Sequence, residues 1–157
     1  MFTETELFER LYQGALKMPC TGSRTIHSDA KFAHTDQLIL MSLSENAYLL
    51  NLSLQKVTYL DWFYGDVLCG IISHDETWAA VGGYQSFAVW HNGSIQTIAF
   101  SSAHDLRQSG PDTLLVLEDP WFEDPHVWEY NVRTKVLAKV RPFPDYAGKP
   151  FTGNVIW

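Results

Sequence analysis

The chain has 157 residues, of which 46% are hydrophobic and 14% aromatic, and its formal net charge is −7. This length and composition exclude a largely disordered chain and favour one domain, over residues 1–157, with a sizeable core. The acidic balance argues against nucleic acid as a partner, because phosphates are neutralised by Lys and Arg, and it favours a basic partner.

Residues 1–22 are predicted to form one helix. Thr3 and Glu6 fit a capping box, apolar residues recur at helical spacing, and Pro19 and Gly22 end the pattern. The start is polar and acidic and does not resemble a signal peptide. No apolar run approaches the roughly 20 residues of a membrane span, so we expect a cytoplasmic protein without membrane association.

After Ser23 the pattern changes to short alternating β runs separated by turn residues. Asn92-Gly93 predicts a two-residue hairpin turn of type I′, and Gly82-Gly83 predicts a bend. Residues 142–157 read as a Pro-rich tail with a last short strand over 155–157. The predicted strands between these points are 37–43, 47–52, 56–62, 66–73, 77–83, 87–92, 94–100, 113–118, 126–131 and 135–140.

A similar pattern recurs three times at a spacing of forty residues. The segments read "NAYLLNLSLQKV", "SFAVWHNGSIQT" and "HVWEYNVRTKVL", and each holds two strands around a polar break. The spacing aligns one large residue per segment, and we expect these residues to point inward: Leu50, Trp90 and Tyr130. The sequence therefore predicts a mainly β fold in which an N-terminal helix precedes about three antiparallel meander units within residues 24–141.

A unit of about forty residues with up to four antiparallel strands resembles a blade of a WD-type β-propeller. The resemblance covers roughly residues 24–141 and implies blade-like units. Closed propellers usually carry at least four blades, so an open curved sheet or an assembly of two chains remains the alternative. In the open forms the helix is expected to cover an unclosed strand edge, because bare edge strands promote aggregation.

Candidate ligands for a metal ion lie in "HSDAKFAHTD", which contains His27, Asp29, His34 and Asp36. Imidazole and carboxylate groups bind zinc or iron, but the same residues are common in turns, where they hydrogen-bond the backbone. We prefer the turn interpretation and expect no metal and no other cofactor. The two cysteines, Cys20 and Cys69, have no metal-type spacing and are expected to be reduced thiols.

Two acidic segments that contain aromatic residues are the candidate contact sites. The first is the loop "EDPWFEDP", residues 118–125, in the third unit, and the second is "DWFYGD", residues 61–66. A desolvated aromatic anchor with a charged rim is typical of an interface. In the alternative interpretation the loop aromatics fold back onto the core. The candidate contact residues are Glu118, Asp119, Trp121, Phe122, Glu123, Asp124, Asp61, Trp62, Tyr64 and Asp66.

Three functions are compatible with these features. The first is a non-catalytic acidic module that occludes a basic protein, because the compact acidic character resembles that of bacterial immunity proteins, which neutralise cationic toxins. The second is a scaffold, monomeric or homodimeric, that docks through its repeat surface. The third is a metal-dependent enzyme using His27 and His34. We prefer the first, because the chain contains neither a G-x-S-x-G motif nor a phosphate-binding glycine loop.

Overall fold

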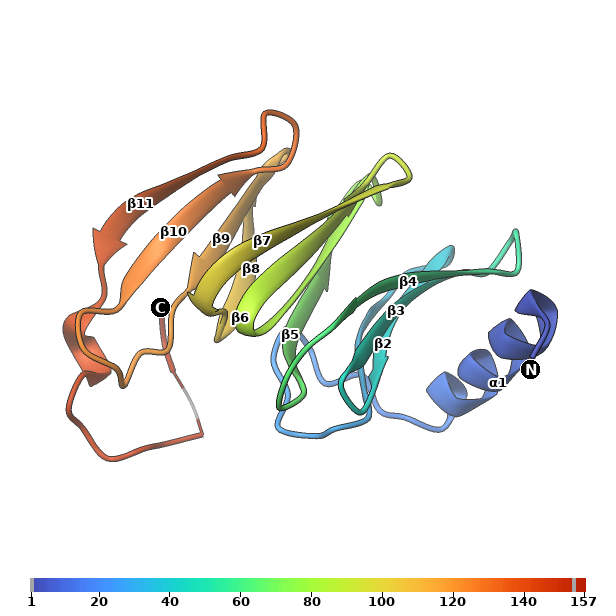
Figure 1. Ribbon diagram of the computed structural model, residues 1–157, viewed down its shortest axis with the longest axis horizontal. Coiled ribbons are helices and arrows are strands. Elements are labelled where there is room, and N and C mark those ends of the chain that lie inside the picture. The colour runs from blue at the N-terminus through green and yellow to red at the C-terminus, as the bar shows by residue number, and fades with distance from the viewer. Residues whose placement is uncertain (1, 154) are drawn as a thin grey trace.

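The computed structural model describes residues 2–153 and 155–157. Met1 and Asn154, which fall in the predicted segments 1–22 and 142–157, lie outside these described residues. Within them the chain forms an N-terminal helix, three antiparallel sheets and a short 3-10 helix, so the mainly β fold is confirmed (Figure 1). The elements are α1 (Glu4–Leu16), β1 (Ala30–His34), β2 (Leu38–Leu43), β3 (Asn46–Asn51), β4 (Lys56–Trp62), β5 (Val67–Ile72), β6 (Trp78–His91), β7 (Ser94–Ser102), β8 (Asp105–Gly110), β9 (Thr113–Leu117), β10 (His126–Asn131), β11 (Val136–Pro142) and η1 (Pro144–Tyr146).

The sheets stand face to face in chain order between α1 and the C-terminal segment (Figure 1). The first sheet has the strand order β1-β2-β3-β4, the second β5-β6-β7, and the third β8-β9-β10-β11. One apolar cluster fills the space between the first and second sheets, and another fills the space between the second and third. Across the described residues this is an open row of sheets, and the resemblance to propeller blades stays a prediction.

Strand β6 is a hairpin within the second sheet. A Cβ atom on Gly82 would lie 3.5 Å from that of Phe87, whereas residues five positions apart in an extended strand are separated by roughly 16 Å. The chain reverses at Gln85, whose φ of 74° lies in the left-handed region. One arm pairs with β5 and the other with β7. The second sheet is therefore a meander of the same form as its neighbours.

The residues aligned at forty-residue spacing occupy matching places in this row. Leu50 packs against α1, Trp90 faces the first sheet, and Tyr130 faces the second sheet. Leu50 and Tyr130 are buried, and Trp90 is half-buried. Each of the three residues thus contacts the element that comes before its own sheet in the row. For the first sheet that element is the helix α1.

Both outer faces of the row are covered. Phe8, Leu11 and Ala15 of α1 pack on Ile39 and Met41 of the first sheet. At the other end of the row, apolar residues of η1 and the tail pack against the outer face of the third sheet, among them Phe143, Tyr146 and Trp157. A terminal cover of this kind is what a stacked array needs to keep its last apolar face out of water. The helix was expected to cover a strand edge, and the structure places it on a sheet face instead.

Two further segments run along the free edges of the first strands of the sheets. Residues 20–25 bridge β1 through Cys20 and β5 through Arg24. The amide of Gly70 in β5 donates to the carbonyl of Ser23 at 2.8 Å. At β8 the indole N–H of Trp157 donates to Asp105 at 2.9 Å. These contacts occupy backbone and side-chain groups that bare edge strands would leave open to other chains.

The structure corrects several strand predictions. Strands β1 and β8 were not expected, while residues 155–157 are not a strand, although the sequence predicted one. The bend expected at Gly82-Gly83 lies two residues later, at Gln85. The turn at Asn92-Gly93 is confirmed, since both φ angles are positive. None of the helices within residues 2–153 and 155–157 is long and apolar enough to span a membrane.

Candidate binding surface

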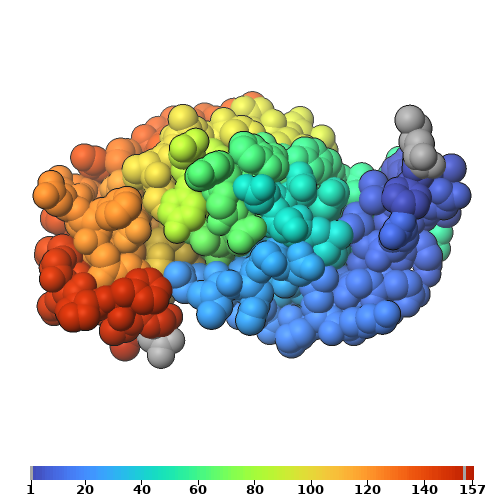
Figure 2. Space-filling view, turned by 60° about the horizontal axis from the view of Figure 1, so that its bottom comes forward, coloured from blue at the N-terminus to red at the C-terminus, as the bar shows by residue number. Residues whose placement is uncertain are grey.

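Both predicted contact segments lie at the same end of the sheets, which we call the lower end. It comprises the turn at residues 44–45, the loop 63–66, the reversal of β6, and the loop 118–125 (bottom of Figure 1). The pairing of Asn46 with Trp62 places the first two of these together. Figure 2 brings this end forward and shows the orange loop 118–125 beside the red C-terminal segment, with the blue segment that precedes β1 next to them.

Glu118 is held inside the fold by hydrogen bonds. Its carboxylate accepts from the indole N–H of Trp128 at 2.7 Å and from the amide of His126 at 3.1 Å, and also from the hydroxyl of Ser101. These three hydrogen bonds hold the loop against β7 and β10. Glu118 is therefore a structural member of the predicted site.

Trp121 also folds inward. Its ring meets His104 edge to face and lies 4.7 Å from the ring of Phe151, centroid to centroid. Its amide donates to the Asp119 carboxylate at 3.0 Å, which fixes the turn. The next three residues, Phe122, Glu123 and Asp124, are exposed, and 60% of the Phe122 surface is accessible. The loop thus divides into an inner half, 118–121, and an outer half, 122–124.

The segment 61–66 presents its aromatic residues to solvent. Trp62 is 51% exposed and Tyr64 is 64% exposed, and their rings meet edge to face with centroids 6.4 Å apart. Asp61 is engaged internally, because its carboxylate accepts from Thr97 of β7 at 3.0 Å. Asp66 is partly exposed beside the reversal of β6. The exposed face of this segment is therefore aromatic with an acidic border.

Tyr84 connects the two predicted segments. It lies at the reversal of β6, and a Cβ atom on Gly65 would be 3.2 Å from its ring, so the ring packs on the 61–66 segment. The same residue lines a cavity with Asp119 and Trp121. Tyr84 is itself exposed. Tyr84 therefore links the segment 61–66 to the cavity beside the loop 118–125.

That cavity, which we call the lower cavity, has a volume of about 320 Å³. Arg24, from the segment along β5, and His104, from the β7–β8 connection, form part of its wall. His104 is buried, and burial together with the nearby Arg24 charge lowers its pKa to about 3. His104 is therefore neutral at physiological pH, and Arg24 and Lys149 carry the positive charge of the cavity.

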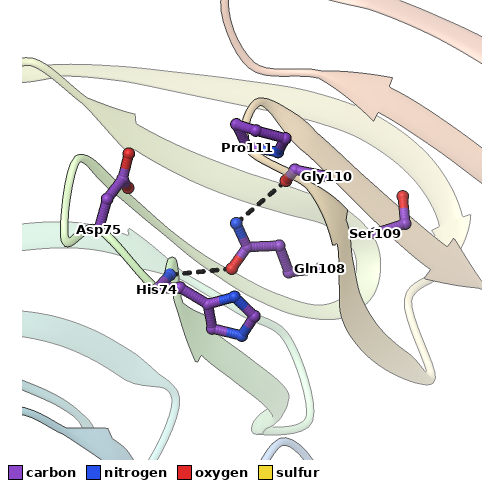
Figure 3. Close-up of a pocket in the computed structure, with 6 residues that line it drawn as sticks. All are labelled: His74, Asp75, Gln108, Ser109, Gly110 and Pro111. Atoms are coloured by element: carbon purple, nitrogen blue, oxygen red, sulfur yellow. Dashed lines mark hydrogen bonds between the residues drawn. The ribbon is translucent and has the colours of Figure 1, made fainter.

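A second cavity, of about 390 Å³, lies at the opposite end between the second and third sheets (Figure 3). Its central side chain, Gln108, accepts from the amide of His74 at 2.9 Å and donates to the carbonyl of Gly110 at 3.0 Å. Asp75 accepts from Ser73 and Thr77 of its own turn. These polar groups join two turns of neighbouring sheets, and the arrangement is that of a structural contact.

The candidate metal ligands are not brought together. His27 and Asp29 precede β1, whereas His34 ends that strand and Asp36 follows it, so the two pairs lie at opposite ends of β1. The Asp29 carboxylate accepts from the amide of Ser44 at 2.8 Å, which is a turn contact. Among residues 2–153 and 155–157, no three His, Cys, Asp or Glu side chains are placed to hold a metal ion. Cys20 is exposed, and Cys69 is buried.

Three residues of the lower end were not identified from the sequence: Arg24, Tyr84 and His104. They come from three separate connections and have no common spacing, so no motif joins them. The sequence offered one signal, the isolated Arg24. A sequence pattern does not distinguish such an arginine from an ordinary cation on the surface. Neither the family models nor the curated proteins with which the chain was compared gave a match.

Proposed function

We propose that this chain is a non-catalytic binding module that uses its lower end to occlude a basic protein. The observation that carries the proposal is the exposure of Trp62, Tyr64 and Tyr84 at one end of the stack of sheets. Tryptophan and tyrosine are the side chains that most often dominate binding energy when a partner covers them.

The acidic border supports a basic partner. Asp66, Glu123 and Asp124 lie at the same end of the sheets as the exposed rings, and the chain as a whole carries a net charge of −7. Such a field attracts a cationic partner and raises its association rate. A cytoplasmic immunity protein that covers the active surface of a cationic bacterial toxin would have this arrangement.

Neutralising the border tests the electrostatic part of the proposal. The triple variant Asp66→Asn, Glu123→Gln and Asp124→Asn should bind the partner with a slower association rate and a weaker dependence on salt. Asp112→Asn is the control because it removes a carboxylate at the opposite end of the sheets. An unchanged association rate in the triple variant would contradict the proposal.

A scaffold function is the second candidate, and strand β7 favours it. β7 lies at the edge of the second sheet and contains no charged residue over Ser94–Ser102. Uncharged edge strands pair with strands of other chains. Sedimentation of the wild type and of Thr97→Lys distinguishes the two candidates, because a scaffold assembled through β7 would dissociate in the variant.

A further inference from the structure

Arg24 lies at the wall of the lower cavity and forms no ion pair with a carboxylate of the described residues. Its Nε atom is buried and has no hydrogen-bond partner among the described residues. Within residues 2–153 and 155–157, Arg133 pairs with Asp112, and the His126 ring lies 3.8 Å from the Glu118 carboxylate. Because a guanidinium is always charged, proteins seldom withdraw it from water unless an acceptor meets it. Arg24 therefore brings to the cavity a positive charge without an ion-pair partner and an N–H donor without an acceptor.

Trp121 contributes a second unmatched donor to the same wall. Its indole Nε1 is buried and has no partner in the part of the chain that the structure describes. Buried indole N–H groups are usually hydrogen-bonded. Ser102 and Lys149, which carry a hydroxyl and an ammonium group, also border the cavity. Its donors therefore come from four separate segments, and two of them remain unsatisfied in the protein alone.

The rest of the wall is largely aromatic. The rings of Trp121 and Phe151 lie 4.7 Å apart, and Tyr84 closes another side. A volume of about 320 Å³ is at the lower limit of pockets that hold small molecules. Asp119 adds one carboxylate to the wall, which disfavours a dianion. The occupant that fits is a planar monoanion with an apolar body.

We propose that the lower cavity binds a carboxylate that carries a small aromatic or apolar group. The carboxylate accepts from the Arg24 guanidinium, whose fork matches its geometry, and from the Trp121 indole. The apolar body lies against the aromatic wall. The same group is presented by a free small carboxylate and by the C-terminus of a peptide. The inference does not rest on the proposed function, because the groups that carry it, Arg24 and Trp121, are not among the exposed rings of the proposed interface.

Calorimetric titration of the full chain tests the proposal. The probes are phenylacetate, its uncharged isostere phenylacetamide, inorganic phosphate, and the tripeptide Gly-Gly-Phe as free acid and as C-terminal amide. The variants are Arg24→Met, which keeps the length of the side chain without its charge, and Trp121→Phe, which removes the indole N–H and keeps an aromatic ring. Arg133→Met at the opposite end is the matched control.

We expect at least one free acid to bind more tightly than its amide, and Arg24→Met to weaken that binding by about tenfold or more. Trp121→Phe should weaken it less, and Arg133→Met should leave it unchanged. Binding of phenylacetate identifies a free carboxylate as the ligand, and binding of the tripeptide alone identifies a peptide C-terminus. Failure of both acids to bind, or a preference for phosphate, would overturn the proposal.

The melting temperature without ligand gives a second readout. Arg24→Met removes an unmatched charge, so the variant should melt no lower than the wild type. If Arg24 had a purely structural role, Arg24→Met would melt at a lower temperature or fail to fold. In that case Trp121→Phe would bind the carboxylate as tightly as the wild type does. That result would also contradict the assignment.

Discussion

The rings of His104 and Trp121 meet edge to face at the wall of the lower cavity, with their centroids 5.3 Å apart. His104 belongs to the connection between the second and third sheets, and Trp121 belongs to the loop 118–125. This contact holds the inner half of the loop against the sheets. The outer half, residues 122–124, is thereby left on the surface beside the exposed tyrosines.

The buried His104 predicts a specific pH dependence of stability. Its pKa is lowered to about 3 in the folded state, whereas an unfolded histidine titrates near pH 6.5. The unfolded chain therefore binds the extra proton between these values, so the folded state loses stability as the pH falls below 6.5. This residue alone should lower the free energy of unfolding by about 2 kcal/mol between pH 7 and pH 5.

Urea unfolding of His104→Gln at the two pH values checks this expectation. The variant should lose about 2 kcal/mol less than the wild type over the same interval. His27→Gln, which changes an exposed histidine, is the control and should behave as the wild type does. Equal losses in His104→Gln and the wild type would show that His104 does not titrate in this way.

Two glutamates of the same loop should differ in their effect on stability. Glu118→Gln disturbs a carboxylate that accepts three hydrogen bonds, and we expect it to lower the free energy of unfolding by about 1–3 kcal/mol. Glu123→Gln changes an exposed side chain and should stay within about 0.5 kcal/mol of the wild type. Thermal unfolding followed by circular dichroism measures both, and equal effects would refute the division of the loop.

Gly82 is required by the close approach of the β7–β8 connection to the second sheet. A Cβ at this position would lie 2.6 Å from the Cβ of Ala103 and 3.1 Å from the Cys69 sulfur. Gly82→Ala should therefore destabilise the fold by about 1–3 kcal/mol. Gly153→Ala, where no atom lies within 4 Å of the added carbon, is the matched control. Denaturant midpoints of the two variants test the prediction, and a neutral Gly82→Ala would contradict this packing.

Removal of residues 1–18 should expose the outer face of the first sheet. Ile39, Met41 and Leu50 would lose the cover of α1, and an apolar sheet face left bare promotes association. The deletion ends at residue 18 because residues 20–25 bridge β1 and β5. Sedimentation should show oligomers or aggregates, whereas the surface variant Glu9→Ala should sediment as the wild type does. A soluble, monomeric deletant would exclude a covering role for the helix.

Much of the fold could be predicted because its signals are local. The capping box of Thr3 and Glu6 is present, and the φ angles of Asn92 and Gly93 suit the predicted turn. Strand β8 was missed because its sequence, "DLRQSG", is mostly polar and gains its strand form by pairing with β9. Residues 155–157 have β-forming side chains, but the Trp157 ring stacks with the Arg107 guanidinium and its indole N–H donates to the Asp105 carboxylate.

The candidate site was less predictable. Composition identified the two aromatic and acidic segments, but it could not distinguish Trp121, which turns inward, from Phe122, which remains exposed. That distinction depends on the packing of His104 and Phe151 around the indole. The lower cavity was not predictable at all, because Arg24 and Trp121 are brought together by the stacking of two sheets.

The measurement that tests the central claim most directly is the affinity of the lower end for a basic protein partner. The wild type, immobilised and exposed to extract of the cell that encodes it, should retain a basic protein, whose affinity is then measured with both proteins purified. The triple variant Trp62→Ala, Tyr64→Ala and Tyr84→Ala should weaken that affinity by about a hundredfold or more. Leu54→Ala, an exposed apolar residue in the hairpin at the opposite end, should bind as the wild type does. Equal affinity of the triple variant and the wild type would contradict the account.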